Sequence, residues 1–242
     1  MARRSAGRPR TPVLTQDRIA RAALDLADAH GDDAITMHRL ARELGVAPSA
    51  LYNHVSGIEE VKLLIQDEMM GRVTTVGLSQ LVEAARRGAR PGEGELSRAL
   101  ETWAWSYRET FARYPGLVPL IATLPVGGAP ATQAMYETVA AGLRAAGLPK
   151  EQVMPVIVAF ESFLFGSAMD VHAPADVFTR APDDDAAATP TLQEALDAQP
   201  AGGVHGGNPY ADPPFRWGLR ALCEATERAC THIPGKEPTA RS

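Results

Sequence analysis

Residues 45–55, GVAPSALYNHV, decide how this chain is organised. They follow the pattern MHRLAREL, whose apolar residues recur at the spacing of one helix face. Gly45 is suited to end that helix, and Pro48 suits the first turn of a second, short helix that runs to about His54. Two short helices joined by a turn of three residues have the dimensions of a helix-turn-helix. The same pattern also fits a plain helical hairpin inside a bundle, and composition alone leaves both open.

The outer side of this hairpin differs from its inner side. Leu40, Leu51 and Val55 would pack between the two helices. The residues left facing outward are small or polar: Pro48, Ser49, Ala50, Asn53 and His54. A surface of this kind is suited to be presented to another molecule rather than buried.

The rest of the chain also favours helices, and no segment has the alternation expected of a strand. The fold class is therefore predicted to be all-α. One helix precedes the hairpin and a longer amphipathic one follows it from Ile58. Further helices are expected over 96–114, 131–146, 149–171 and 215–230, with a short one near 116–124. Pro155 is expected to kink its helix or to mark a late start. Residues 173–212 are expected to form a long loop in which only TPTLQEALDAQ is helical.

These patterns predict four segments. Residues 1–14 form a basic flexible arm, 15–57 a three-helix domain with the helix-turn-helix, 58–85 a connecting helix, and 86–242 a larger helical domain.

Charge and composition limit the class of protein. The 242 residues carry a formal net charge of −5, which alone argues against nucleic acid. The first twelve residues, however, hold four arginines and no acidic residue, which favours a DNA or membrane contact there. A solubilising disordered end is the alternative for this arm. No secretory signal is recognised, and Glu161 interrupts the longest apolar run, so no membrane span is expected. Cys223 and Cys230 are too far apart on a helix for a disulfide, which predicts a reducing, cytoplasmic location.

Signatures of catalysis and of metal binding do not occur in the chain. It has no G-x-S-x-G, G-x-G-x-x-G, P-loop or HExxH pattern, and its six histidines are scattered. Two cysteines seven residues apart do not make a zinc site. We therefore expect neither an enzyme nor a bound metal or cofactor.

The stretch ITMHRLARELGVAPSALYNHVSG, residues 35–57, resembles the DNA-binding helices of the tetracycline-repressor (TetR) family. The preceding IARAALDLADAHG resembles the first helix of that family. A weaker resemblance to the tetracycline-repressor subgroup extends through LRAAGLPKEQVMPVIVAFESFLFG, TLQEALDA and PFRWGLRALCEA. It implies an N-terminal DNA-binding domain and a C-terminal domain for effector binding and dimerisation.

The resemblance also implies individual DNA contacts. It makes Thr36, Tyr52 and His54 phosphate contacts, and it directs His38, Pro48, Ser49 and Asn53 toward base edges. Hydroxyl groups and asparagine suit these roles chemically. The arm is expected to add positive charge in or near the minor groove through Arg3, Arg4, Arg8 and Arg10. The family often has a lysine where this chain has Ile58, so one phosphate contact is expected to be missing.

The aromatic residues of the larger domain allow two interpretations, plain core or the wall of an effector pocket. The candidate effector-binding residues are Trp103, Tyr107, Phe111, Phe160, Glu161 and Phe163. A buried carboxylate is costly unless it is paired. Glu161 is therefore expected to pair with Arg216 or Arg220, to meet a ligand, or to titrate at raised pH. His172 is expected to cap a helix C-terminus or to bind ligand.

The subgroup resemblance implies a homodimer built on the helices at 149–171 and 213–230. The residues expected at its interface are Phe215, Gly218, Leu219 and Leu222. The sequence thus predicts a dimeric repressor that binds palindromic operator DNA and is released by a small hydrophobic effector. A constitutive DNA-binding architectural protein without an effector is the alternative.

Overall fold

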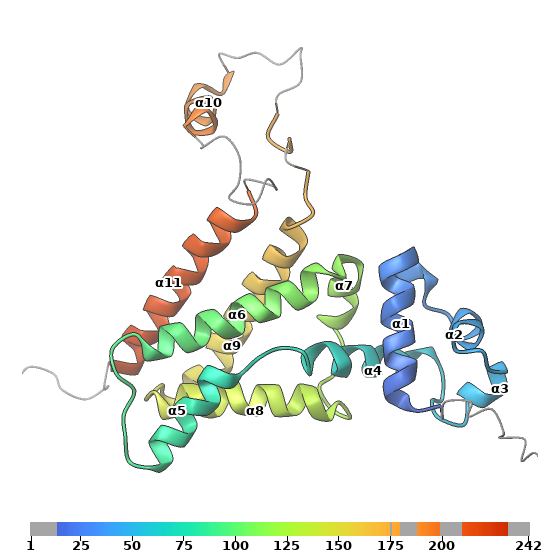
Figure 1. The fold of residues 1–242 in the computed structure, drawn as a ribbon. Helices are drawn as coiled ribbons and strands as arrows, with labels where there is room; N and C mark the ends of the chain where they lie inside the picture. Colours follow the sequence, from blue (N-terminus) through green and yellow to red (C-terminus); the bar gives the residue numbers. More distant parts are fainter. Residues whose placement is uncertain (1–13, 175, 180–187, 199–209, 232–242) are drawn as a thin grey trace, which may run out of the picture.

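A computed structural model describes residues 14–174, 176–179, 188–198 and 210–231 of the protein (Figure 1). Every regular element within these ranges is a helix, which confirms the all-α expectation. The basic arm lies outside the described residues except for its last residue, Leu14. So do parts of the long loop predicted over 173–212.

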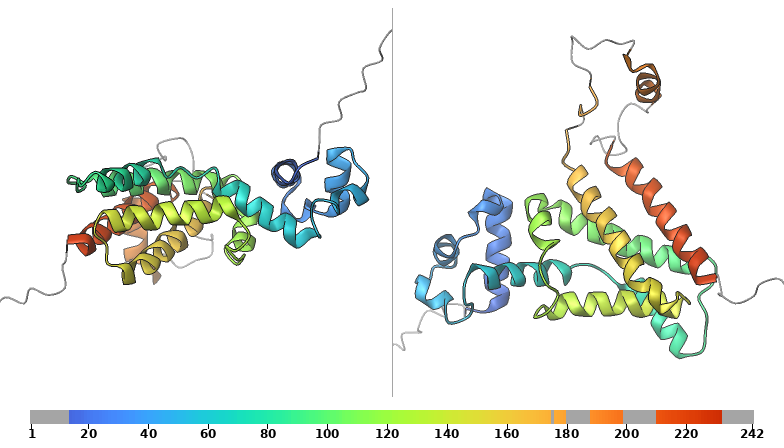
Figure 2. Two further views of the ribbon diagram at one scale, coloured as in Figure 1. Left: turned by 90° about the horizontal axis from the view of Figure 1, so that it is seen from below. Right: turned by 180° about the vertical axis from the view of Figure 1, so that it is seen from behind.

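Three helices and a short 3₁₀ turn form one end of the molecule, coloured blue in Figures 1 and 2. Their bounds are α1 Gln16–His30, η1 Asp32–Ala34, α2 Met37–Leu44 and α3 Pro48–Leu51. Thr15 caps α1, because its hydroxyl oxygen accepts a hydrogen bond from the backbone N–H of Arg18 at 3.3 Å. Helix α1 packs on α2 and on α4, and it buries Ile19, Ala23 and Leu26 against them.

The connecting helix predicted over 58–85 is two helices in the structure, α4 Ile58–Met70 and α5 Val76–Arg86. The break coincides with a contact to another helix. Val73 is buried in the core, and the backbone N–H of Thr74 donates to the Ser106 hydroxyl at 2.9 Å. A side chain of α6 thus takes a donor that a continuous helix would have used for itself.

The remaining helices form the larger end of the molecule. Their bounds are α6 Glu95–Ala112, η2 Pro115–Leu117, α7 Val118–Ile121, α8 Pro130–Ala145, α9 Lys150–Asp170, α10 Pro190–Asp197 and α11 Asp212–Thr231. Helix α6 packs on α5, α9 and α11, and α8 packs on α4, α5 and α9. Helix α10 stands away from this body in Figure 1 and in the right-hand view of Figure 2. We call the packed helices α5, α6, α8, α9 and α11 the helical body.

Helix α9 begins at Lys150, five residues before Pro155, so the expectation of a late start was wrong. Pro155 has no backbone N–H, so one backbone hydrogen bond near the start of the helix is not formed. The helix is long and apolar enough to cross a bilayer by length and composition alone. Its buried residues Ile157, Phe160 and Leu164 instead pack against neighbouring helices of the body.

Candidate nucleic-acid interface and the helical body behind it

The turn between α2 and α3 depends on Gly45. This residue has φ 65° and ψ 33°, the left-handed conformation that favours glycine because other residues meet steric strain there. Leu40 and Leu51 lie on the inner sides of the two helices and are fully buried. Helix α3 itself ends at Leu51, earlier than predicted. A hydrogen bond from the His54 N–H to the Leu51 carbonyl, at 2.8 Å, continues the turn beyond it.

The residues predicted to contact DNA lie on the outside of this unit. Six of them are exposed: Thr36, His38, Pro48, Ser49, Tyr52 and Asn53. Tyr52 is 57% exposed. An aromatic side chain exposed to this extent is typical of a surface that another molecule covers. His54 is half-buried, and its carbonyl oxygen accepts a hydrogen bond from Gln16 at 3.0 Å. The four arginines of the arm lie outside the described residues.

Thr36 can serve two roles at once. Its hydroxyl oxygen accepts a hydrogen bond from the Arg39 N–H at 3.3 Å and so caps α2. The hydroxyl proton is not used in this contact. It remains available to donate to a phosphate oxygen beside the helix N-terminus.

Two arginines of α2 were missed by the sequence analysis. Arg39 and Arg42 are exposed and line a cleft of about 300 Å³ together with His38 and Pro48. Their position beside residues already assigned to DNA was the signal that could have identified them. Two guanidinium groups next to a candidate recognition helix are suited to donate hydrogen bonds to phosphate oxygens.

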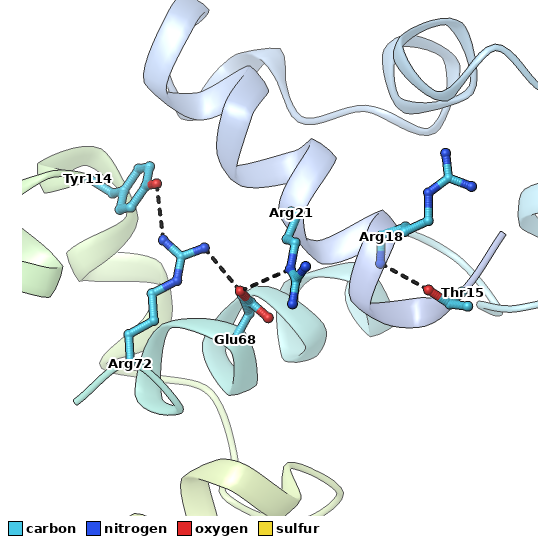
Figure 3. A network of polar contacts seen from close by, with 6 residues as sticks. All are labelled: Thr15, Arg18, Arg21, Glu68, Arg72 and Tyr114. Carbon is cyan, nitrogen blue, oxygen red and sulfur yellow. Dashed lines mark hydrogen bonds and ion pairs between the residues drawn. The ribbon is translucent and has the colours of Figure 1, made fainter. Parts of the chain in front are cut away.

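Helix α4 connects this unit to the helical body through a chain of charged groups (Figure 3). Glu68 on α4 lies between two arginines, Arg21 of α1 at 3.4 Å and Arg72 at 3.0 Å. Arg72 also donates to the hydroxyl of Tyr114, just after α6, at 3.4 Å. One carboxylate thus ties α1 and α4 to each other and, through Arg72, to the end of α6.

A second connection bypasses α4. Arg113, which follows α6, pairs with Asp28 of α1 at 2.8 Å. The hydrogen bond from Arg113 lowers the pKa of the Asp28 carboxyl. Both side chains are largely exposed, so the pair positions the two ends more than it stabilises the fold.

The candidate effector residues are packed together in the helical body. Trp103, Tyr107 and Phe111 follow one another at four-residue spacing along α6, and each is at most 1% exposed. The Tyr107 and Phe111 rings stack at 4.8 Å, and Trp103 meets Phe160 of α9 at 5.6 Å. Phe163 is half-buried and stacks on Phe215 at 5.5 Å. The structure therefore places Trp103, Tyr107, Phe111 and Phe160 in a closed aromatic core, while Phe163 remains partly exposed.

Glu161 pairs with neither Arg216 nor Arg220, so that expectation was wrong. Its carboxylate instead accepts hydrogen bonds from the hydroxyl groups of Tyr107 at 3.1 Å and Tyr136 at 2.5 Å. Burial raises the pKa of Glu161 and outweighs the two hydrogen bonds, which lower it. The upward titration allowed by the sequence analysis is the alternative that the structure supports.

His172 follows α9, and its ring Nε2 lies 2.6 Å from the carbonyl oxygen of Ala112, the last residue of α6. It therefore caps the C-terminus of α6 rather than that of its own helix. The carbonyl oxygens at a helix end carry partial negative charge, which suits an imidazole N–H.

The residues expected at the dimer interface make packing contacts within a single chain. Phe215 and Leu219 are 1% and 3% exposed and pack α11 onto the helical body. A Cβ atom on Gly218 would lie 2.5 Å from the Phe163 ring, so this glycine permits a close approach within the chain. Leu222 is half-buried. Since Phe215 and Leu219 point into the interior, the outer faces of α9 and α11 are formed by other residues.

Comparison with known protein families identifies both parts of the chain. Residues 19–61 match the family described as "Bacterial regulatory proteins, tetR family". Residues 89–203 match the domain described as "Tetracyclin repressor-like, C-terminal domain". The two matches together cover more than half of the chain. The protein belongs to the TetR family of transcriptional regulators.

Individual TetR-family relatives agree with this assignment. The chain is 31% identical over 157 residues to the HTH-type transcriptional repressor DrrR1 of Streptomyces coeruleorubidus, which is 65% of this chain and 53% of that protein. The match thus spans only about half of the length of DrrR1. The fold is similar to that of the TetR-family protein ActR of Streptomyces coelicolor in complex with (S)-DNPA, with a TM-score of 0.67 at 25% identity, covering 88% of this chain and 96% of that one. ActR has also been solved in complex with actinorhodin, where the TM-score is 0.68 at 24% identity, over 89% and 96% of the two chains.

Proposed function

We propose that this TetR-family protein is a homodimeric, cytoplasmic repressor that binds a two-fold symmetric operator and leaves it when a small molecule binds the helical body. The observation that carries the proposal is the exposed surface of α2 and α3. Tyr52 and Asn53 stand outward there, while Leu40 and Leu51 hold the two helices from within. Exposed hydroxyl and amide groups on a rigid helix pair fit phosphate oxygens and base edges.

Charge on α2 supports the same function. Arg39 and Arg42 add cations beside the exposed polar residues, in a protein whose net charge is −5. Local positive charge on an acidic chain is what a DNA contact requires. The arginines of the arm would extend this charge into the neighbouring minor groove.

The outer faces of α9 and α11 support a homodimer. Met154, Val158 and Met169 on α9 are 48–56% exposed, and Trp217 on α11 is 76% exposed. The exposed small residues of α9, Ala159 and Gly166, lie between the larger ones and would let a second helix approach closely. Exposed apolar residues along two neighbouring helices are typical of a surface that another chain covers. The interface would therefore use these residues, with Phe215 and Leu219 supporting them from the interior.

The effector part of the proposal rests on two observations. ActR, whose fold is similar, has been solved with actinorhodin and with (S)-DNPA. In this chain, the polar links Glu68–Arg72–Tyr114 and Asp28–Arg113 join the DNA-binding end to α6. A ligand that shifts α6 would act on α1 and α4 through these contacts. Such a shift releases DNA only to the extent that the ligand prefers the released arrangement.

In vitro selection from random duplex DNA tests the proposal. The purified protein should enrich a palindrome whose half-sites are separated by about one helical turn, 34–36 Å, or a multiple of it. A gel-shift screen of small molecules against the selected site should then find compounds that release it. Enrichment of no common sequence would contradict operator binding. A specific site that no compound releases would instead favour a constitutive DNA-binding protein.

A further inference from the structure

An open cleft lies where the end of α6, the chain after α9 and the start of α11 meet. Its volume is about 610 Å³, within the range of roughly 300–1,000 Å³ that small-molecule sites occupy. The cleft is separate from the closed aromatic core, since none of the candidate effector residues lines it. The residues that line it are Trp105, Arg108, Glu109, Ala112, Arg113, Val171, His172, Asp212 and Arg216.

Arg108 is the buried charge in the wall of this cleft, with an exposed fraction of 3%. Its Nη1 donates to the Asp212 carboxylate at 2.8 Å, and its Nε donates to the Ser167 carbonyl at 3.3 Å. Its Nη2 is buried and has no hydrogen-bond partner among the described residues. A buried charged donor without an acceptor is costly, so a shift of the Arg108 side chain that brings Nη2 to an acceptor in the cleft, which this residue lines, would remove that cost.

Arg216 adds a second positive charge to the same cleft. Its guanidinium lies 4.8 Å from the centre of the Trp105 ring, and no described residue forms an ion pair with it. Asp212 is already neutralised by Arg108, which leaves Glu109 as the other acidic residue of the wall. The lining residues thus include three arginines and two carboxylates, and Arg216 is the arginine among them that has no ion-pair partner in the described part of the chain.

The wall beside these arginines is flat and aromatic. Trp105 is half-buried and meets the Phe215 ring edge to face at 4.6 Å. The Arg108 guanidinium lies 4.5 Å from the centre of the Phe215 ring. Guanidinium groups stacked on aromatic rings remain able to donate hydrogen bonds at their edges, which suits a planar carboxylate.

We propose that this cleft is the effector site and that the effector is a flat aromatic acid. Its carboxylate accepts hydrogen bonds from Arg108 Nη2 and from Arg216, and its ring lies against Trp105. This inference rests on the proposed function, because it names the ligand class for the release step. It also gives that step a route, since Arg113 both lines the cleft and pairs with Asp28 on α1.

Calorimetric titration of the full-length protein, without DNA, tests the inference with two matched probes. The first is 1-hydroxy-2-naphthoate, and the second is 1-hydroxy-2-naphthamide, which keeps the shape and removes the charge. The carboxylate should bind at least about tenfold more tightly than the amide, a difference of roughly 1.4 kcal/mol. Arg216→Gln should remove most of this difference. Arg220→Gln removes the same charge one turn further along α11, outside the cleft, and should leave it unchanged.

Three results would overturn the inference. One is equal affinity for the two probes, and another is no binding of the carboxylate up to about 5 mM. The third is a carboxylate preference that Arg216→Gln and Arg108→Lys both leave intact, which would place the anion elsewhere. Unchanged melting temperatures of the variants exclude unfolding as the cause of weaker binding. Selection of operator DNA, measured separately, would still succeed in each case, so failure of this site is distinguishable from failure of the proposed function.

Discussion

The hydroxyl of Tyr136 on α8 donates a 2.5 Å hydrogen bond to the carboxylate of Glu161 on α9. Tyr107 of α6 donates to the same oxygen, so one partly buried carboxyl group joins three helices of the body. Burial raises the pKa of Glu161, which means that the fold holds the proton more tightly than the unfolded chain does. Ionised Glu161 therefore destabilises the fold, and the hydrogen bonds from the two tyrosines reduce this destabilisation without removing it.

This arrangement predicts how stability depends on pH. The stabilising contribution of protonated Glu161 is fully present below the unfolded pKa of about 4.3 and is lost as the pH rises through the folded pKa. Glu161→Gln keeps an acceptor for a tyrosine and cannot ionise. The difference in unfolding free energy between this variant and the wild type should therefore grow in favour of glutamine from pH 4.5 to pH 7.5. Urea titrations at both pH values measure it, and a difference that does not change with pH would contradict the prediction.

The candidate DNA-binding residues predict two different effects. Tyr52→Phe removes only a hydroxyl group from an exposed ring, so it should weaken binding to all operator sequences by a similar factor, about tenfold for one phosphate contact. Asn53→Ala should instead relax the preference at one base pair, by about 1–3 kcal/mol. Gel shifts on the selected operator and its single-base variants separate the two effects. Gln133→Ala, on the exposed side of α8, is the control. Wild-type affinity and preference in both variants would remove these residues from the interface.

The basic arm predicts a change in salt dependence. Deleting residues 1–12 removes all four of its arginines, and with them the counterions that they would release from DNA. The slope of log affinity against log salt should become shallower by about 0.9 for each phosphate that the arm neutralises. Filter binding at several salt concentrations measures the slope. An unchanged slope would show that the arm neutralises no phosphate.

The exposed side of α9 predicts the effect of a charge on assembly. Val158→Asp should weaken dimerisation at least about tenfold, because an unpaired carboxylate would be buried in the interface. Val76→Asp is a matched control, since Val76 is 59% exposed and Val158 is 52% exposed. It should remain dimeric. Sedimentation at micromolar concentration gives the oligomeric state, and a dimer that tolerates Val158→Asp would move the interface away from this face.

Local rules were enough to predict most helices and the DNA-binding unit. Thr36 as a cap, Gly45 as a turn and the inward leucines each follow from neighbouring residues. The break between α4 and α5 was missed, because it depends on Ser106, a residue 32 positions from Thr74. The partners of Glu161 were missed for the same reason. Tyr107 and Tyr136 approach it only once three helices have packed, and no sequence spacing reveals that. The burial of Phe215 and Leu219 within the chain was not predicted either, because an apolar stripe does not indicate whether its own chain or a second one covers it.

The contact between Arg72 and Tyr114 predicts which variants lose the response to effector while still binding DNA. Arg72→Ala removes the link from Glu68 to the end of α6 but leaves the Arg21–Glu68 pair in place. The ratio of operator dissociation constants with and without a releasing compound should fall several-fold, since mutations along such networks change coupling by about 0.5–2 kcal/mol. Operator affinity without the compound should stay within about threefold of the wild type. Tyr114→Phe, which removes the same hydrogen bond from the other side, should lower the ratio in the same direction. Arg87→Ala breaks an ion pair of similar geometry, 3.0 Å to Glu83 within α5, and should leave the ratio unchanged. A ratio that is equal in all three variants and the wild type would show that effector binding is transmitted through other residues, of which the Asp28–Arg113 pair is the first to test.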